Sequence, residues 1–181
     1  MSLSSTTDFH RLVENIKAWG KALGFQQVGI SDIDLSQHEA HLKQWLEKGY
    51  QGEMGYLAEH GMKRARPDEL LPGTLRVISV RMDYLPPNAK FAHTLKDKNK
   101  AYVSRYALGR DYHKLLRNRL KKLGDKIRSE CEDLSEELQY RPFVDSAPVL
   151  EHAIAEKAGK DNDCPYEDST ACMRPCNLYC Y

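Results

Sequence analysis

The stretch RVISVRMDYL, from Arg76 to Leu85, is the clearest β-strand in the sequence and decides the fold class. Val77, Ile78 and Val80 are β-branched residues that favour an extended backbone, and Pro86-Pro87 would end the strand. Helical and extended patterns alternate on both sides of this strand. We therefore expect an α+β fold, similar to an α/β sandwich, in which helices flank a central sheet.

Before this strand, the sequence predicts two helices and a shorter strand. Apolar residues recur at helical spacing from Phe9 to Leu23, and Gly24 is suited to end that helix. Residues 25–30 alternate in polarity and predict a strand. Ser36 and Glu39 have the spacing of a capping box, which predicts a second helix beginning at Ser36.

After the strand, the segment from Tyr112 to Arg128 predicts a helix with one apolar stripe, made of Leu116, Leu120, Leu123 and Ile127. Residues 101–104 are a candidate strand, and residues 138–145 are expected to form a strand that Pro142 interrupts. A further helix is expected over residues 149–158, begun by the proline that precedes it.

Composition places the chain among ordinary globular proteins. Its 181 residues are 41% hydrophobic, with 27 basic and 26 acidic side chains. No run approaches the roughly 20 apolar residues of a membrane span, and the polar start from Met1 to His10 lacks the apolar core of a signal peptide. We expect a cytoplasmic monomer without a membrane partner.

The last 22 residues, 160–181, differ from everything before them, because they show no apolar period. Their cysteines are spaced C-x7-C, C-x3-C and C-x3-C, which fits neither a zinc ribbon nor a bacterial iron-sulfur run. We expect an irregular, oxidisable tail and no metal site. The cysteines concerned are Cys164, Cys172, Cys176 and Cys180.

The common nucleotide and hydrolase signatures are absent, including the dinucleotide G-x-G-x-x-G, the P-loop, H-E-x-x-H and G-x-S-x-G. Asp111-Tyr112-His113 begins like the D-x-H-x-x-G motif that supplies a histidine to the cobalt of some cobalamin enzymes. Leu116 stands where that motif needs glycine, so the match fails.

The segment YVSRYALGRDYH, from Tyr102 to His113, concentrates hydroxyl, guanidinium and aromatic groups around Gly109. Such a set suits a large ligand that offers many hydrogen-bonding groups and flat surfaces. The alternative is a turn whose tyrosines cover the edge of a sheet.

Asp145 stands at the end of a predicted strand, before Ser146-Ala147-Pro148. In an apolar pocket a carboxyl group resists ionisation and can act as a proton donor. The alternative is a structural role, in which Asp145 caps the helix that begins near Pro148. The sequence leaves both open.

Eight basic residues lie between Arg110 and Arg128, against two acidic ones. Positions on one face of the predicted helix could neutralise a phosphate backbone, and the alternative is an ordinary solvated face. The candidates for nucleic-acid contact are Lys114, Arg117 and Lys121.

From about Phe9 to Gly159, the chain resembles the epoxyqueuosine reductases, which are cobalamin-dependent, iron-sulfur oxidoreductases that complete queuosine in tRNA. The resemblance lies in several blocks in the same order along the chain. They are His60-Gly61-Met62, Arg64-Ala65-Arg66-Pro67, Leu70-Leu71-Pro72-Gly73-Thr74, residues 76–85, residues 102–113, Phe143-Val144-Asp145-Ser146-Ala147-Pro148 and Ala155-Glu156-Lys157-Ala158-Gly159.

The resemblance implies that residues 1–159 form the family's amino-terminal cobalamin-binding domain. It implies that Asp145 lies at the cofactor and gives its proton to the epoxide oxygen as the epoxide opens to the alkene. Arg66 and the segment Ser104-Arg105-Tyr106 match stretches that line the cobalamin site. No side chain is expected to bind cobalt from below, and the basic helix gains tRNA as its expected partner.

The resemblance stops after Gly159, where the family continues with a ferredoxin-like module that carries [4Fe-4S] clusters. Residues 160–181 do not match that module, and Ser169 and Asn177 stand where a ligand and a proline are expected. We therefore expect an epoxyqueuosine reductase, or its truncated fragment, that depends on an external electron donor. The alternative is a non-catalytic remnant that still binds cobalamin or tRNA. A frame change or a truncation would each give this pattern.

Overall fold

The computed structural model describes residues 9–84, 91–131, 138–159 and 176–180. The helices are α1 (Phe9–Ala22), α2 (Ser36–Glu47), α3 (Tyr56–Glu59), η1 (Gly61–Ala65), α4 (Pro67–Leu70), α5 (Phe91–Lys96), η2 (Arg105–Ala107), α6 (Tyr112–Glu130) and α7 (Glu151–Gly159). The strands are β1 (Gln27–Ser31), β2 (Arg76–Arg81), β3 (Tyr140–Phe143) and β4 (Cys176–Cys180).

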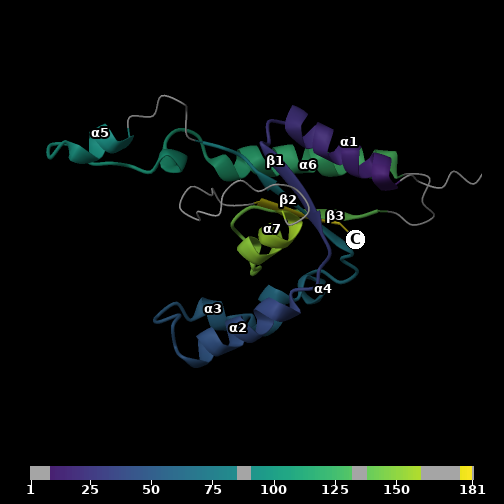
Figure 1. The fold of residues 1–181 in the computed structure, drawn as a ribbon, viewed down its shortest axis with the longest axis horizontal. Helices are drawn as coiled ribbons and strands as arrows, with labels where there is room; N and C mark the ends of the chain where they lie inside the picture. The colour runs from purple at the N-terminus through teal and green to yellow at the C-terminus, as the bar shows by residue number, and fades with distance from the viewer. Residues whose placement is uncertain (1–8, 85–90, 132–137, 160–175, 181) are drawn as a thin grey trace, which may run out of the picture.

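The four strands form one antiparallel sheet in the order β1-β2-β4-β3 (Figure 1). Helices α1 and α6 lie side by side over one face, and α7 packs against β1 and β2. The expected α+β architecture, a central sheet flanked by helices, is confirmed.

Strand β2 lies between β1 and β4, and both of its faces are buried. Ile78 and Val80 point to the face that α1 and α6 cover, where they pack with Leu120 and Leu123. Val77 points to the opposite face and packs with Ile154 of α7. Alternate residues of a strand face opposite sides of a sheet, so one apolar run supplies two cores.

The cysteine-containing tail differs from its prediction in one part. Residues 176–180 are not irregular, because they form β4 and pair with β2 on one side and β3 on the other. Residues 160–175 lie outside the described residues. The expected tail is therefore wrong for residues 176–180, whose backbone completes the centre of the sheet.

The predicted capping box is also wrong. Leu35 precedes α2 as its N-cap residue, and no side chain caps the helix. The backbone N–H of Ser36 donates to the carboxylate of Asp34 at 3.0 Å. Glu39 is drawn instead to Arg66, whose guanidinium lies 2.6 Å from one of its oxygens. A charged partner outcompetes the weaker bond that Glu39 would make to its own backbone.

Other elements also differ from expectation. Strand β2 ends at Arg81 and not at Leu85, and β1 spans Gln27–Ser31 where residues 25–30 were predicted. Residues 101–104 do not form a strand. Strand β3 is shorter than predicted, and it tolerates Pro142 because it lies at the edge of the sheet, where one side of its backbone needs no partner. Helix α7 begins at Glu151, two residues after the predicted start. Gly24, with φ of 87°, follows the end of α1 as predicted.

Candidate active site

Asp145 lies two residues beyond the end of β3, and β3 is a strand at the edge of the sheet. The preceding residue, Val144, is fully buried and anchors the chain in the core. Asp145 itself has φ of 53°, a left-handed conformation that aspartate tolerates better than most residues. Its side chain is only 9% exposed. The turn therefore directs a carboxyl group inward rather than into solvent.

Two side chains from the start of α6 meet this carboxyl group. The hydroxyl group of Tyr112 donates a hydrogen bond to Oδ2 of Asp145. Nε2 of His113 lies 3.7 Å from the same oxygen. The aromatic rings of Tyr112 and His113 are stacked, with centroids 4.1 Å apart. Asp145 therefore belongs to a small polar cluster together with the first turn of α6.

Asp111 explains why α6 begins at this point. Its Oδ1 accepts the backbone N–H of His113 at 3.0 Å, which is the bond expected of an N-cap residue. The same oxygen lies 2.9 Å from Nδ1 of the His113 ring. These hydrogen bonds from His113, the ring contact first, lower the pKa of Asp111 below its ordinary 3.8. Asp111 therefore fixes both the helix start and the His113 ring.

The alternative structural role for Asp145 is not observed. Helix α7 begins at Glu151, and Leu150 is the residue before it, with its carbonyl accepting from Ile154. Asp145 is several residues too early to cap that helix. Its carboxyl group instead contacts Tyr112, which is 33 positions away in sequence.

A row of tyrosines continues from this cluster. The ring of Tyr106 lies edge-on to that of Tyr112 and to that of Tyr84, with 6.0 Å between centroids in each pair. Tyr106, a predicted cofactor residue, is thus linked to Asp145 through Tyr112, because its ring contacts the Tyr112 ring and the Tyr112 hydroxyl group binds Asp145. Ser104 immediately precedes the short helix η2, which contains Arg105 and Tyr106.

This region also exposes large apolar side chains, in sequence positions on both sides of η2. The exposed residues are Tyr84, Val103, Tyr106, Leu108 and Leu115.

Arg66, the other predicted cofactor residue, is engaged elsewhere. Its guanidinium group binds both carboxylate oxygens of Glu39, at 2.6 Å and 3.0 Å, and approaches Glu69 at 2.7 Å. These two acids, Glu39 first, raise the pKa of the guanidinium group, and Arg66 in turn lowers the pKa of Glu39. Arg66 therefore ties α2 to α4 in this structure.

The predicted nucleic-acid residues lie on one exposed face of α6. Their spacing of three and four residues places them on neighbouring turns. The first of them is two residues beyond Tyr112, about 200° around the helix, so this basic face points away from the side of α6 that carries Tyr112. Other basic residues of the helix pack on rings, as Lys126 does on Trp19. The face consists of Lys114, Arg117 and Lys121.

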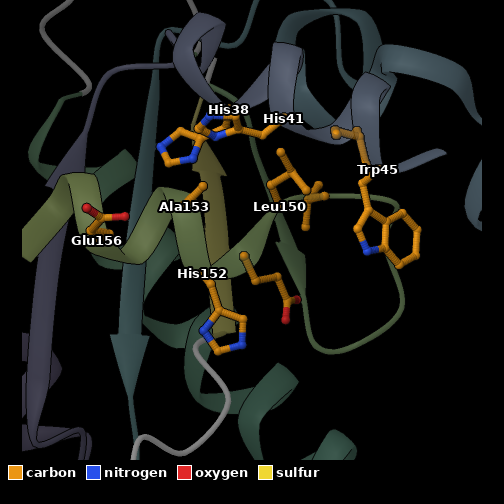
Figure 2. A pocket seen from close by; sticks show the side chains of 10 residues that line it. His38, His41, Trp45, Leu150, His152, Ala153 and Glu156 are labelled. Atoms are coloured by element: carbon orange, nitrogen blue, oxygen red, sulfur yellow. The ribbon is translucent and has the colours of Figure 1, made fainter. Parts of the chain in front are cut away.

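A cavity of about 520 Å³ opens between α2 and α7 (Figure 2). His38, His41 and Trp45 of α2 line one side, and His152 and Glu156 of α7 line the other. Figure 2 shows the His152 ring pointing away from His38 and His41. Asp145 is not among the lining residues, so this cavity is separate from the carboxyl cluster. Sequence analysis did not single it out.

Among the described residues, no group of three or more histidine, cysteine, aspartate or glutamate side chains is placed to hold a metal ion. In the same part of the chain, no helix is both long enough and apolar enough to cross a membrane.

Four residues of this site were not predicted individually, namely Tyr84, Tyr112, His113 and Asp111, of which Asp111 positions the His113 ring. The signal for three of these was present, because they belong to or end the dense segment from residue 102 to 113. Tyr84 was treated only as part of a strand. Its role depends on contact with Tyr106, which sequence spacing does not specify.

Comparison with known proteins places this geometry in context. Residues 64–146, which include Asp145, match the family model described as Epoxyqueuosine reductase QueG, DUF1730. The epoxyqueuosine reductase of Aliivibrio fischeri is 68% identical over 152 residues, which cover 84% of this chain and 40% of that protein. The chain thus spans about two fifths of the length of this curated relative.

Two solved structures share the fold. One is an epoxyqueuosine reductase with an epoxyqueuosine-modified tRNA-Tyr stem loop, with a TM-score of 0.69 and 20% identity. The other is the epoxyqueuosine reductase from Bacillus subtilis, with its catalytic aspartate loop swung out of the active site, with a TM-score of 0.68 and 19% identity. Each likeness covers 96% of this chain and 46% of the other protein.

Proposed function

The chain is homologous to epoxyqueuosine reductases, and from this relationship we propose that it carries the cobalamin-binding and proton-donating part of such an enzyme. The substrate is epoxyqueuosine in tRNA, and the product is queuosine. The observation that carries the proposal is the carboxyl group of Asp145, which is 9% exposed and held by Tyr112 beside a surface of exposed tyrosines.

Reduction of an epoxide to an alkene consumes two electrons and two protons and releases the oxygen as water. Cobalamin, when bound, supplies a reduced cobalt centre for the electron transfer. Asp145 supplies a proton to the epoxide oxygen as its bond to carbon breaks. Proton donation by a positioned side chain typically contributes 10²- to 10⁴-fold to a rate.

The other residues of the cluster position this donor. The Tyr112 hydroxyl group fixes the orientation of the carboxyl group, and the left-handed backbone at Asp145 directs it inward. Tyr84 and Tyr106 offer ring surface on which a corrin can pack. Ser104 and Arg105 can donate hydrogen bonds to its amide groups. Arg66 would serve the cofactor only by exchanging its contacts with Glu39 and Glu69.

The basic face of α6 suits the tRNA stem. Its three side chains, Lys114, Arg117 and Lys121, can each neutralise a phosphate and release counterions. We place the reaction in the cytoplasm, in a monomer that receives electrons from an external low-potential donor.

Cofactor binding is tested by mixing the purified chain with cob(II)alamin. We expect a change in the corrin absorption spectrum and comigration of corrin with protein on a sizing column. A spectrum identical to that of free corrin, together with separate elution, would refute the cofactor assignment.

Turnover is tested with cobalamin, an epoxyqueuosine-modified tRNA stem loop and reduced titanium citrate as the electron donor. Asp145→Asn keeps the shape and the left-handed backbone but removes the proton, so the rate of queuosine formation should fall by about 10²-fold or more. Asp68→Asn, on an exposed turn of α4, is the matched control and should retain the rate. Corrin and tRNA binding without turnover would favour the non-catalytic remnant.

A further inference from the structure

His113 occupies a place that the proposed reaction does not yet use. Its Nε2 faces Oδ2 of Asp145 at 3.7 Å, and its Nδ1 faces Oδ1 of Asp111 at 2.9 Å. One imidazole ring therefore stands between two carboxyl groups. We infer that His113 is a positioning residue that returns a proton to Asp145 after each turnover, with Asp111 setting the orientation of its ring. This inference rests on the proposed function.

The need for such a residue follows from burial. The Asp145 side chain is 9% exposed, whereas those of His113 and Asp111 are 41% and 49% exposed. A cofactor and a nucleoside packed on the tyrosine row would cover what remains of Asp145. The imidazole ring would still reach water from its own side, because it lies on the first exposed turn of α6.

The proton balance is simple. Asp145 gives its proton to the epoxide oxygen and becomes a carboxylate. The imidazolium of His113 then gives its Nε2 proton to that carboxylate, which restores the acid and leaves a neutral imidazole. A proton from bulk solvent then returns to Nε2. No electrons move in these steps.

Asp111 makes this direction of transfer possible. Its Oδ1 is held by the backbone N–H of His113 at 3.0 Å, and its lowered pKa keeps it ionised. A carboxylate at 2.9 Å from Nδ1 keeps the proton on that nitrogen, so Nε2 becomes the site that gains and loses one. This arrangement uses the helix cap as the orienting group.

Tyr112 supports the same geometry. Its ring stacks on the imidazole, with 28° between the ring planes, and its hydroxyl group holds Oδ2 of Asp145. The 3.7 Å gap exceeds the roughly 3.2 Å of a good hydrogen bond, so the ring must approach by a few tenths of an ångström for transfer.

The coupling can be measured without turnover. In the full chain labelled with ¹⁵N-histidine, we expect the Nε2 resonance of His113 to move in Asp145→Asn, and the Nδ1 resonance to move in Asp111→Asn. The Asp68→Asn variant should leave both unchanged. If neither Asp145→Asn nor Asp111→Asn moves its resonance, His113 does not sense these carboxyl groups and the inference is overturned.

The kinetic arm uses the turnover assay described above. His113→Ala should lower kcat at least 10-fold while leaving KM for the tRNA stem loop unchanged, and added imidazole should restore a part of kcat. His113→Gln keeps hydrogen-bonding groups but cannot relay a proton, so it should remain slow. A wild-type kcat in His113→Ala, or a change in KM alone, would overturn the relay.

Failure of the inference and failure of the proposed function are distinguishable. If the unaltered chain forms no queuosine, the proposed function fails, and the resonance shifts still decide whether His113 is coupled to Asp145. If the chain is active and His113→Ala folds, as judged by its circular dichroism spectrum, but keeps full kcat, only the relay fails.

Discussion

Gly124 lies in the middle of α6, where it lets β3 pack closely against the helix. A Cβ atom at this position would meet three ring atoms of Tyr140 at 2.5–2.7 Å. This contact sets the distance between α6, which carries Tyr112, and β3, which leads into Asp145. Gly124→Ala is therefore a test of the packing that assembles the cluster.

The sign of the effect depends on whether the Tyr140 ring can move. Its hydroxyl group donates to Asp125 and to the carbonyl group of Lys121, and the Arg128 guanidinium group lies 4.7 Å from the ring centroid. Alanine would favour the helix by about 1 kcal/mol, but overpacking against a held ring costs about 1–3 kcal/mol. We expect a net loss of about 1 kcal/mol, or roughly 2–4 °C in Tm.

The assay is urea unfolding followed by circular dichroism, with a double-mutant cycle through Tyr140→Ala. Without the ring, Gly124→Ala should become stabilising, by up to about 1 kcal/mol. Asn118→Ala, at an exposed position of α6, is the control for helix propensity and should not depend on Tyr140. A stabilising Gly124→Ala in the unaltered background would refute the argument.

Three further predictions concern the core, acid stability and tRNA binding. Leu120 is fully buried between α6 and the sheet, so Leu120→Ala should lower the free energy of unfolding by about 2–5 kcal/mol in urea, whereas Leu115→Ala at an exposed position should change it little. The Lys157 ammonium group holds the pKa of Asp32 below its ordinary 3.8. A lowered pKa contributes stability that is present above pH 4 and lost as pH falls through the folded value. Lys157→Met should therefore flatten the acid side of a stability-against-pH curve, by a small amount because the two side chains are partly exposed, at 30% for Lys157 and 52% for Asp32. A triple glutamine variant of the basic face of α6 should weaken binding of a tRNA stem loop and reduce the slope of log K against log salt by roughly 2–3, at about 0.7–0.9 for each phosphate. A matched triple variant at Lys43, Lys48 and Lys63 should leave that slope unchanged; equal effects of both triples would contradict a specific face.

The sequence by itself determined the elements whose own residues carry a strong period. Helices α1 and α6 were predicted with nearly correct bounds, and strand β2 with its correct start but an end four residues too late, because β-branched residues in an extended run and apolar residues at helical spacing bury themselves wherever a partner exists. Asp145 was identified as a candidate because it follows a strand, which is also a local property.

Tertiary structure decided what depends on partners distant in sequence. Strand β4 has no apolar period of its own, and it is defined by the backbone groups of β2 and β3 on either side of it, which any extended segment can satisfy. Glu39 does not make the predicted capping bond, because folding brings the Arg66 guanidinium group next to its carboxylate. Tyr112 and His113 become partners of Asp145 only when α6 packs against the sheet. Such contacts depend on where the residues lie in space, and no sequence pattern indicates them.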